Sequence, residues 1–133
     1  MILQKESSKE LESLYVDNDE AALDSMLRMA LSPLLGFTRD GKIISKDPYL
    51  RLSLPARILS SLLARLAMVR LGVPGAKAES TAEDLAEDCL AEVKACRECL
   101  SRLKGRKLLD RNQGGYFLPI WAASKAVAEI RKD

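Results

Sequence analysis

The chain has 133 residues, of which 47% are hydrophobic and 30% are charged, a balance typical of a globular domain with an apolar core. Its formal net charge is only +2, so any attraction to nucleic acid must come from local clustering of Lys and Arg. No apolar run reaches the roughly 18 residues that a membrane span needs, and the first ten residues lack the basic-then-apolar order of a signal peptide. We therefore expect a cytoplasmic protein without a membrane partner.

Histidine is absent, which removes the commonest general base and the commonest metal ligand. The sequence contains no nucleophile and base pair, glycine-rich phosphate loop or set of carboxylate ligands at useful spacing. We expect a protein that is not an enzyme and that has no cofactor and no metal. Asn and Gln are scarce, a depletion typical of thermophilic proteins.

Residues 1–50 contain two expected helices and a hairpin, and form a candidate oligomerisation segment. A capping box at Ser7–Glu10 predicts a short first helix. A second helix should begin with Asp19 as its N-cap. Its apolar stripe would consist of Leu23, Met26, Leu27, Ala30 and Leu31. An Asp-Gly pair between apolar flanks predicts a hairpin over 37–44 with a two-residue turn.

The segment 53–71 has the strongest helical pattern of the chain. Ser53 is a candidate N-cap, Pro55 fits the first turn, and Gly72 ends the pattern. The apolar residues at helical spacing are Leu54, Ile58, Leu59, Leu62, Leu63, Leu66 and Val69. We expect this helix to lie in the core.

Charge is segregated once along the chain, at an expected turn between two helices. Residues 79–88 carry acids and no base, and a capping box from Ser80 to Glu83 predicts a helix with Leu85, Ala86 and Cys89 inward. Residues 94–111 carry many bases, with only Glu98 and Asp110 as acids. A helix that begins near Glu92 would bury Cys96, Leu100 and Leu103 on one face. Its other faces would present Lys94, Arg97, Ser101, Arg102 and Lys104.

Residues 108–119 have the pattern of a strand, a turn and a second strand. Gly114 and Gly115 supply the reversal, and Pro119 ends the pairing. From Ile120 onward the helical spacing returns, which predicts a closing helix at the end of the chain. We interpret Tyr116, Phe117 and Trp121 as core anchors, with stacking on bases as the alternative.

The stretch from Leu85 to Pro119 resembles the winged helix-turn-helix superfamily of transcription regulators. The resemblance is carried by Leu85-Ala86, Leu100, Leu103, Leu108-Leu109 and Gly115-Tyr116. With the preceding helix it covers about the last half of the chain. It implies a mainly α fold with small β hairpins, in which an N-terminal helical segment precedes a winged helix-turn-helix domain with a closing helix at 51–133.

The resemblance also implies a transcriptional regulator that binds double-stranded DNA. Helix 92–104 would enter the major groove, and the hairpin at 108–118 would be the wing. The candidate DNA-binding residues are Lys94, Arg97, Ser101, Arg102 and Lys104 on the helix, and Arg111, Asn112 and Gln113 on the wing. A homodimer would double this footprint, and the hydrophobic helices outside the motif are its candidate interface.

An alternative is a winged-helix module that binds a protein partner within a larger complex and has no nucleic-acid ligand. Glu92 and Glu98 favour it, because an acidic side chain near phosphate costs affinity. Lys107 also stands where the superfamily commonly has glycine.

Three cysteines, Cys89, Cys96 and Cys99, lie close together in the sequence. A structural metal site would usually need a fourth ligand, and without histidine the obvious donor is missing. We interpret the three residues as buried apolar thiols, with a redox switch as the alternative.

Overall fold

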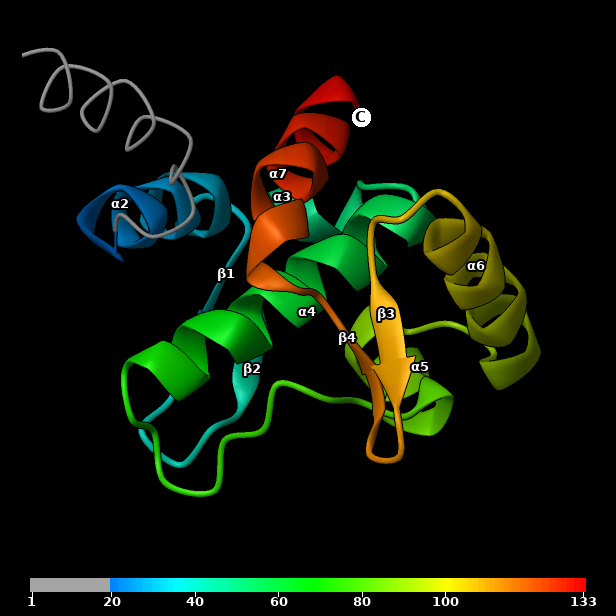
Figure 1. Cartoon of the computed structure of the whole chain (residues 1–133), viewed down its shortest axis with the longest axis horizontal. Helices are drawn as coiled ribbons and strands as arrows, with labels where there is room; N and C mark the ends of the chain where they lie inside the picture. Colours follow the sequence, from blue (N-terminus) through cyan, green and yellow to red (C-terminus); the bar gives the residue numbers. More distant parts are fainter. Residues whose placement is uncertain (1–19) are drawn as a thin grey trace, which may run out of the picture.

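The computed structural model describes residues 20–133, which fold mainly into helices with two small antiparallel hairpins (Figure 1). In chain order the elements are α2 Glu20–Leu31, β1 Leu35–Phe37, β2 Ile43–Ser45, α3 Asp47–Leu50, α4 Leu54–Arg70, α5 Ala82–Cys89, α6 Val93–Gly105, β3 Asp110–Asn112, β4 Gly115–Phe117, η2 Ile120–Ala122 and α7 Ala123–Lys132. The expected mainly α class with small β hairpins is confirmed. The helix expected from Ser7–Glu10 lies outside the described residues. Within residues 20–133, no helix is long and apolar enough to cross a membrane.

Helix α4 is the element around which the others pack. It contacts α2, α5, α6 and α7, and residues on all its sides are buried. Its N-cap is Ser53, as predicted, whose Oγ accepts a hydrogen bond from the Ala56 amide at 3.4 Å. The expectation that Val69 belongs to the buried face is wrong, since it is 42% exposed. Met68 takes the buried position in the last turn, and adjacent residues of a helix point in different directions.

The first hairpin follows α2, whose expected stripe is buried except for the partly buried Met26. β1 and β2 pair with Phe37 opposite Ile43. The expected two-residue turn is wrong, because the Thr38 amide donates to the Lys42 carbonyl at 2.9 Å and three residues make the reversal. Gly41, with φ 87°, supplies the left-handed residue that a three-residue loop requires.

Helices α5 and α6 are joined by a tight turn at residues 90–92. The capping box of α5 consists of Thr81 and Asp84, so the expected box that starts at Ser80 is wrong by one residue. Ser80 is instead paired with Tyr116, through backbone hydrogen bonds of 2.8 Å in both directions. Helix α6 begins after Glu92, close to the predicted start, and the expected inward set of each helix is buried.

The second hairpin is shorter than expected. β3 and β4 pair with Arg111 opposite Tyr116, and the two leucines at 108–109 are buried outside the strands. They leave the ladder because Lys107, two residues after the end of α6, is in the left-handed conformation at φ 61°. The Leu108 amide then bonds back to the Leu103 carbonyl at 3.0 Å. Lys107 is at the position where the superfamily commonly has glycine.

The chain closes with η2 and α7, which packs on α4. The expectation that Trp121 anchors the core is wrong, because its side chain is 55% exposed. Trp121 falls in the 3₁₀ turn, where Ala122 takes the buried position. The Asp133 carboxylate accepts a hydrogen bond from the Ser53 amide at 2.7 Å and so joins the end of α7 to the start of α4.

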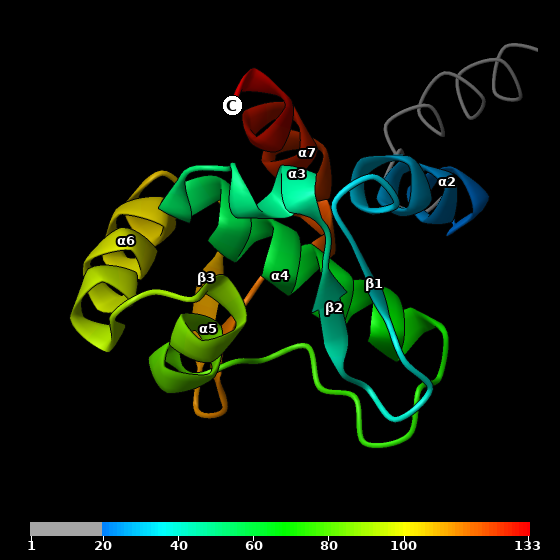
Figure 2. The same ribbon diagram turned by 180° about the vertical axis from the view of Figure 1, so that it is seen from behind.

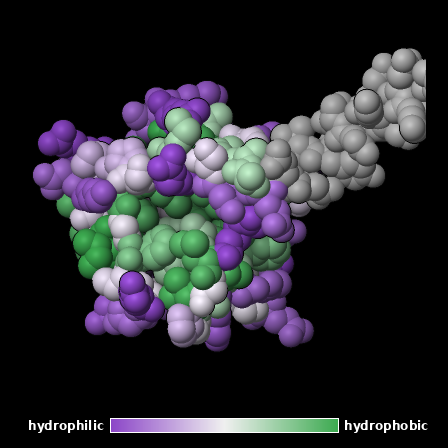
Figure 3. All heavy atoms as spheres, turned by 90° about the vertical axis from the view of Figure 1, so that its left-hand side faces the viewer, coloured by the Kyte–Doolittle hydropathy of each residue, from purple (hydrophilic) through white to green (hydrophobic). Residues whose placement is uncertain are grey.

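An apolar recess of about 420 Å³ lies between α2, β1 and the end of α4. Its apolar lining is Leu27, Leu31, Leu35, Phe37, Ala67 and Leu71. Figure 3 shows apolar side chains gathered on this side of the molecule, with polar side chains around them. At the rim, Arg70 pairs with Asp24 at 2.6 Å. In Figures 1 and 2, α6 lies at the opposite end of the molecule from α2.

Gly115 allows the segment before α5 to lie against the second hairpin. Its φ is 126°, and an added Cβ would lie 2.5 Å from the Ser80 carbonyl oxygen. We expect Gly115→Ala to lower the free energy of unfolding by about 3 kcal/mol, measured by urea denaturation. Gly114→Ala is the matched control, because its Cβ would meet no atom closer than 3.4 Å. Equal losses in the two variants would contradict this role for Gly115.

Candidate nucleic-acid interface

All eight candidate DNA-binding residues have exposed side chains. Those on α6 project from the face opposite Cys96, Leu100 and Leu103, which are buried against the core. The others lie on β3 and at the tip of the second hairpin, at the same end of the molecule as α6 (Figure 1). Burial of one face of α6 therefore leaves the basic face open to solvent.

The structure brings four of the eight candidates together around one hollow. This hollow, of about 330 Å³, lies between the start of α5, α6 and the hairpin, and we call it the reading groove. Arg97 lines it from α6, and Arg111, Asn112 and Gln113 line it from the hairpin. Thr81 and Glu83 line it from the start of α5.

The remaining candidates lie on α6 outside the groove. Residues three or four apart share a helix face, so Lys94, Ser101 and Lys104 lie in one stripe with Arg97. Arg102 lies about 140° around the helix from Arg97 and does not belong to that stripe. Among the described residues, neither Lys94 nor Lys104 makes an ion pair. Both ammonium groups are therefore available to a ligand.

Two acidic residues bond to candidate DNA-binding residues. Arg97 Nη2 lies 2.6 Å from Glu83 Oε1, with the two side chains 64% and 58% exposed. Asn112 Nδ2 donates to Glu79 Oε1 at 3.2 Å. The pKa of Glu83 lies below its usual value. The larger cause is a hydrogen bond between its carboxylate and its own backbone, and the second is the hydrogen bond with Arg97. The carboxylate is therefore ionised at neutral pH.

The sequence reasoning missed Glu79 and Glu83 because it separated an acidic helix from a basic one. Glu79 lies before α5 and reaches Asn112 because Ser80 pairs with Tyr116 on the hairpin, a contact without a local signal in the sequence. For Glu83 the signal was the short turn at 90–92. A turn of that length makes α5 and α6 neighbours, and the two helices are in contact. Side chains that are distant in the sequence can then form ion pairs across the two helices.

The hairpin tip is ordered by its own contacts. Asn112 Oδ1 accepts a hydrogen bond from the Gly114 amide at 2.8 Å. The Arg111 guanidinium lies over the Tyr116 ring, 5.2 Å from its centroid. The charged head of Arg111 is therefore placed over Tyr116, on a residue that is exposed as a whole.

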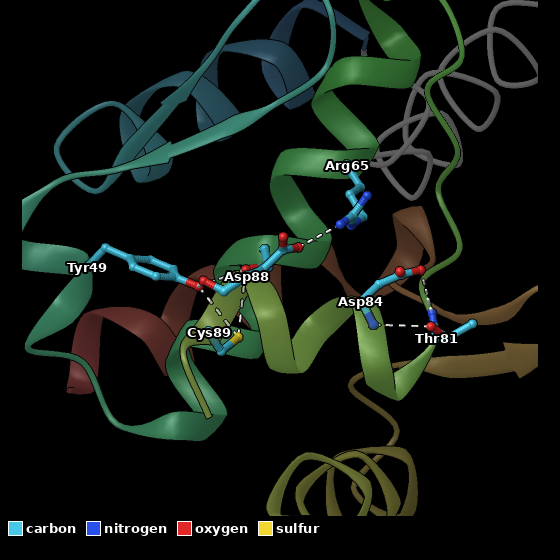
Figure 4. Close-up of polar contacts among 7 residues, drawn as sticks. Tyr49, Arg65, Thr81, Asp84, Asp88 and Cys89 are labelled. Atoms are coloured by element: carbon cyan, nitrogen blue, oxygen red, sulfur yellow. Dashed lines mark hydrogen bonds and ion pairs between the residues drawn. The ribbon is translucent and has the colours of Figure 1, made fainter. Parts of the chain in front are cut away.

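A buried polar cluster fixes the end of α5 on the core (Figure 4). The Tyr49 hydroxyl is 2.9 Å from Ser61 Oγ and 3.2 Å from the Asp88 carbonyl oxygen, and burial raises the pKa of Tyr49. Arg65 Nη2 pairs with the Asp88 carboxylate at 2.6 Å. These bonds join α3, α4 and α5 and so determine where α6 begins.

The three cysteines are free and buried, as expected. Burial raises the pKa of each thiol, to about 11 for Cys99. Within residues 20–133, no cluster of three or more His, Cys, Asp or Glu could hold a metal ion.

We expect the thiols to react slowly in the folded protein. Only the thiolate is the nucleophile. The raised pKa lowers the fraction of each thiol that is ionised, and burial keeps the reagent away from the sulfur. At about pH 8, a disulfide reagent should modify the native chain slowly and the urea-unfolded chain quickly. The rate is measured by the release of the reagent's coloured thiol. Rapid modification of the native chain would contradict the buried placement.

Comparison with protein-family models, with curated proteins and with solved structures finds no match for the chain. The residues that line the groove are therefore the basis for inferring what it binds. Two arginines, the polar tip of the hairpin and the Glu83 carboxylate line it, a combination suited to binding a charged ligand.

Proposed function

We propose that residues 51–133 form a winged helix-turn-helix that binds double-stranded DNA, and that the protein is a cytoplasmic transcriptional regulator. The element order supports this proposal: α4, the Ser80 bridge, α5, α6, β3 and β4 follow one another as helix, short strand, two helices and wing. The single observation that carries it is the reading groove, where exposed Arg97 on α6 faces Arg111 on the hairpin.

In this proposal α6 enters the major groove of the duplex. A helix about 10 to 12 Å across fits a major groove about 12 Å wide. Arg97 with the stripe of Lys94, Ser101 and Lys104 would contact base edges and phosphates, while Arg102 reaches the backbone on one flank. Arg111, Asn112 and Gln113 would contact the neighbouring groove from the wing.

Lys94→Ala and Lys104→Ala test this interface. Each removes an exposed ammonium that pairs with no acid among the described residues, so each should flatten the salt dependence of the logarithm of the binding constant by about 0.9. The measurement is fluorescence anisotropy with a short labelled duplex of mixed sequence, titrated from about 50 to about 200 mM salt. The free energy of unfolding should change by less than about 0.5 kcal/mol.

The matched control is Lys125→Ala, which removes an exposed lysine from α7. It should leave the salt dependence unchanged. Absence of wild-type binding at low salt would overturn the DNA proposal. An equal effect of Lys125→Ala would show that only total charge is sensed.

The second part of the proposal is that the protein is a homodimer through the apolar recess. A two-fold dimer places the same patch of both copies face to face. The recess lies beside α2, at the end of the molecule away from α6 (Figure 1). Self-association through it would therefore leave both reading grooves open. The exposed Leu71 lies within this face.

Leu71→Asp should shift the protein from dimer to monomer, because it places a charge in an apolar contact. Leu71 is already 70% exposed, so the fold of the monomer should survive. Light scattering behind size-exclusion chromatography gives the molar mass. Leu90→Asp is the matched control, a 73% exposed leucine at the end of α5 outside the recess. A wild-type monomer at all concentrations would overturn the dimer.

A protein-binding module is the second candidate function. The observation that favours it is the mixed charge around the reading groove, which Glu83 lines beside Arg97 and Arg111. A second acid, Glu79, bonds to the groove residue Asn112. A partner with both acidic and basic side chains would complement such a surface better than a duplex does. Affinity capture of a stoichiometric protein, unchanged by nuclease treatment, would distinguish this function from DNA binding.

A further inference from the structure

We propose that Glu83 is an internal competitor for the DNA phosphate at Arg97, so that the segment 79–83 limits the affinity of the reading groove. The inference rests on the proposed DNA-binding function and concerns the regulation of the same site. In the free protein the Glu83 carboxylate pairs with the guanidinium of Arg97, and a duplex phosphate competes with it for that charge.

The ion pair is the first observation behind this assignment. Glu83 Oε1 lies 2.6 Å from Arg97 Nη2, the separation of a charge-assisted hydrogen bond. A phosphate oxygen would use the same guanidinium donors at the same distance. The carboxylate takes up one of the five N–H donors of Arg97, and its negative charge repels a phosphate that approaches the remaining donors.

A second acid accepts a hydrogen bond from a candidate DNA-binding residue on the hairpin side of the groove. Glu79 Oε1 accepts from the Asn112 amide at 3.2 Å. Both acids come from the one segment that is held against the hairpin by the Ser80–Tyr116 bridge. One short acidic segment therefore reaches a candidate DNA-binding residue on the helix and another on the hairpin.

The backbone keeps this segment in place. Thr81 and Asp84 form the capping box of α5, with the Asp84 amide donating to Thr81 Oγ1 at 3.1 Å. Gly115 allows the Ser80 carbonyl to approach the hairpin closely. Glu83 is thus presented to the groove by a well-ordered first turn and is not an incidental surface charge.

Competition has a defined signature in the salt dependence. When Arg97 moves from Glu83 to a phosphate, one charge contact replaces another and few additional ions are released. Without the carboxylate, the contact between Arg97 and phosphate counts fully. The slope of the logarithm of the binding constant against that of salt should then steepen by about 0.9.

The experiment compares Glu83→Gln with Glu87→Gln in the full-length chain, by anisotropy with the labelled mixed-sequence duplex. Glu87 is an exposed acid of the same helix that lines a different hollow, with Arg65 and Asp88. Both variants change the net charge equally. We expect Glu83→Gln to bind about fivefold more tightly at low salt with the steeper slope, and Glu87→Gln to change neither by more than about twofold.

A double-mutant cycle with Arg97→Ala identifies the residue through which Glu83 acts. The gain from Glu83→Gln should disappear in the Arg97→Ala background. A gain that persists there, or equal gains from the two glutamine variants, would overturn the inference while DNA binding stands. Absence of binding by the wild type at low salt would overturn the proposed function, and the inference with it.

Discussion

The burial of α4 on all its sides is the constraint on which the rest of the structure depends. Leu62 and Leu63 are fully buried, and the polar Ser60 and Ser61 are buried beside them. A helix that is covered all round needs partners on every side, and α2, α5, α6 and α7 supply them. The position of each outer helix is therefore determined by its contact with α4, and the short hairpins follow from the connections between those helices.

The polar cluster around Tyr49 makes the placement of α5 specific. Apolar contacts alone would allow α5 to slide along α4, because the hydrophobic effect has no direction. The Tyr49 hydroxyl bonds to Ser61 and to the Asp88 carbonyl, and Arg57 Nη1 donates to the Cys89 carbonyl at 2.6 Å. These directional bonds hold the end of α5, and the turn that follows then determines where α6 begins.

Electrostatics at the groove connects this architecture with the proposed DNA binding. The net charge of +2 supplies little long-range attraction, so binding would depend on the stripe of α6 and on the hairpin. Exposed ion pairs contribute little to folding, commonly under about 1 kcal/mol. The exposed pair between Glu83 and Arg97 therefore contributes little to stability, and we propose a role for it only in ligand binding.

Local pattern allowed much of the structure to be predicted from the sequence. Ser53 is an N-cap as expected, α6 begins next to Glu92, and Cys96, Leu100 and Leu103 face the core. Caps and helical periodicity could be predicted because they depend only on residues within one or two turns. The exposure of the basic side chains of α6 follows from the same periodicity.

Contacts between distant segments were decided only by the tertiary structure. The sequence could not show that Glu83 reaches Arg97, that Ser80 pairs with Tyr116, or that Trp121 lies outside the core. Each depends on how helices pack against α4, and packing depends on the whole set of buried side chains rather than on neighbours along the chain. The amino-acid sequence by itself determined which faces are apolar and which are basic, while the tertiary structure decided which acids lie beside those bases.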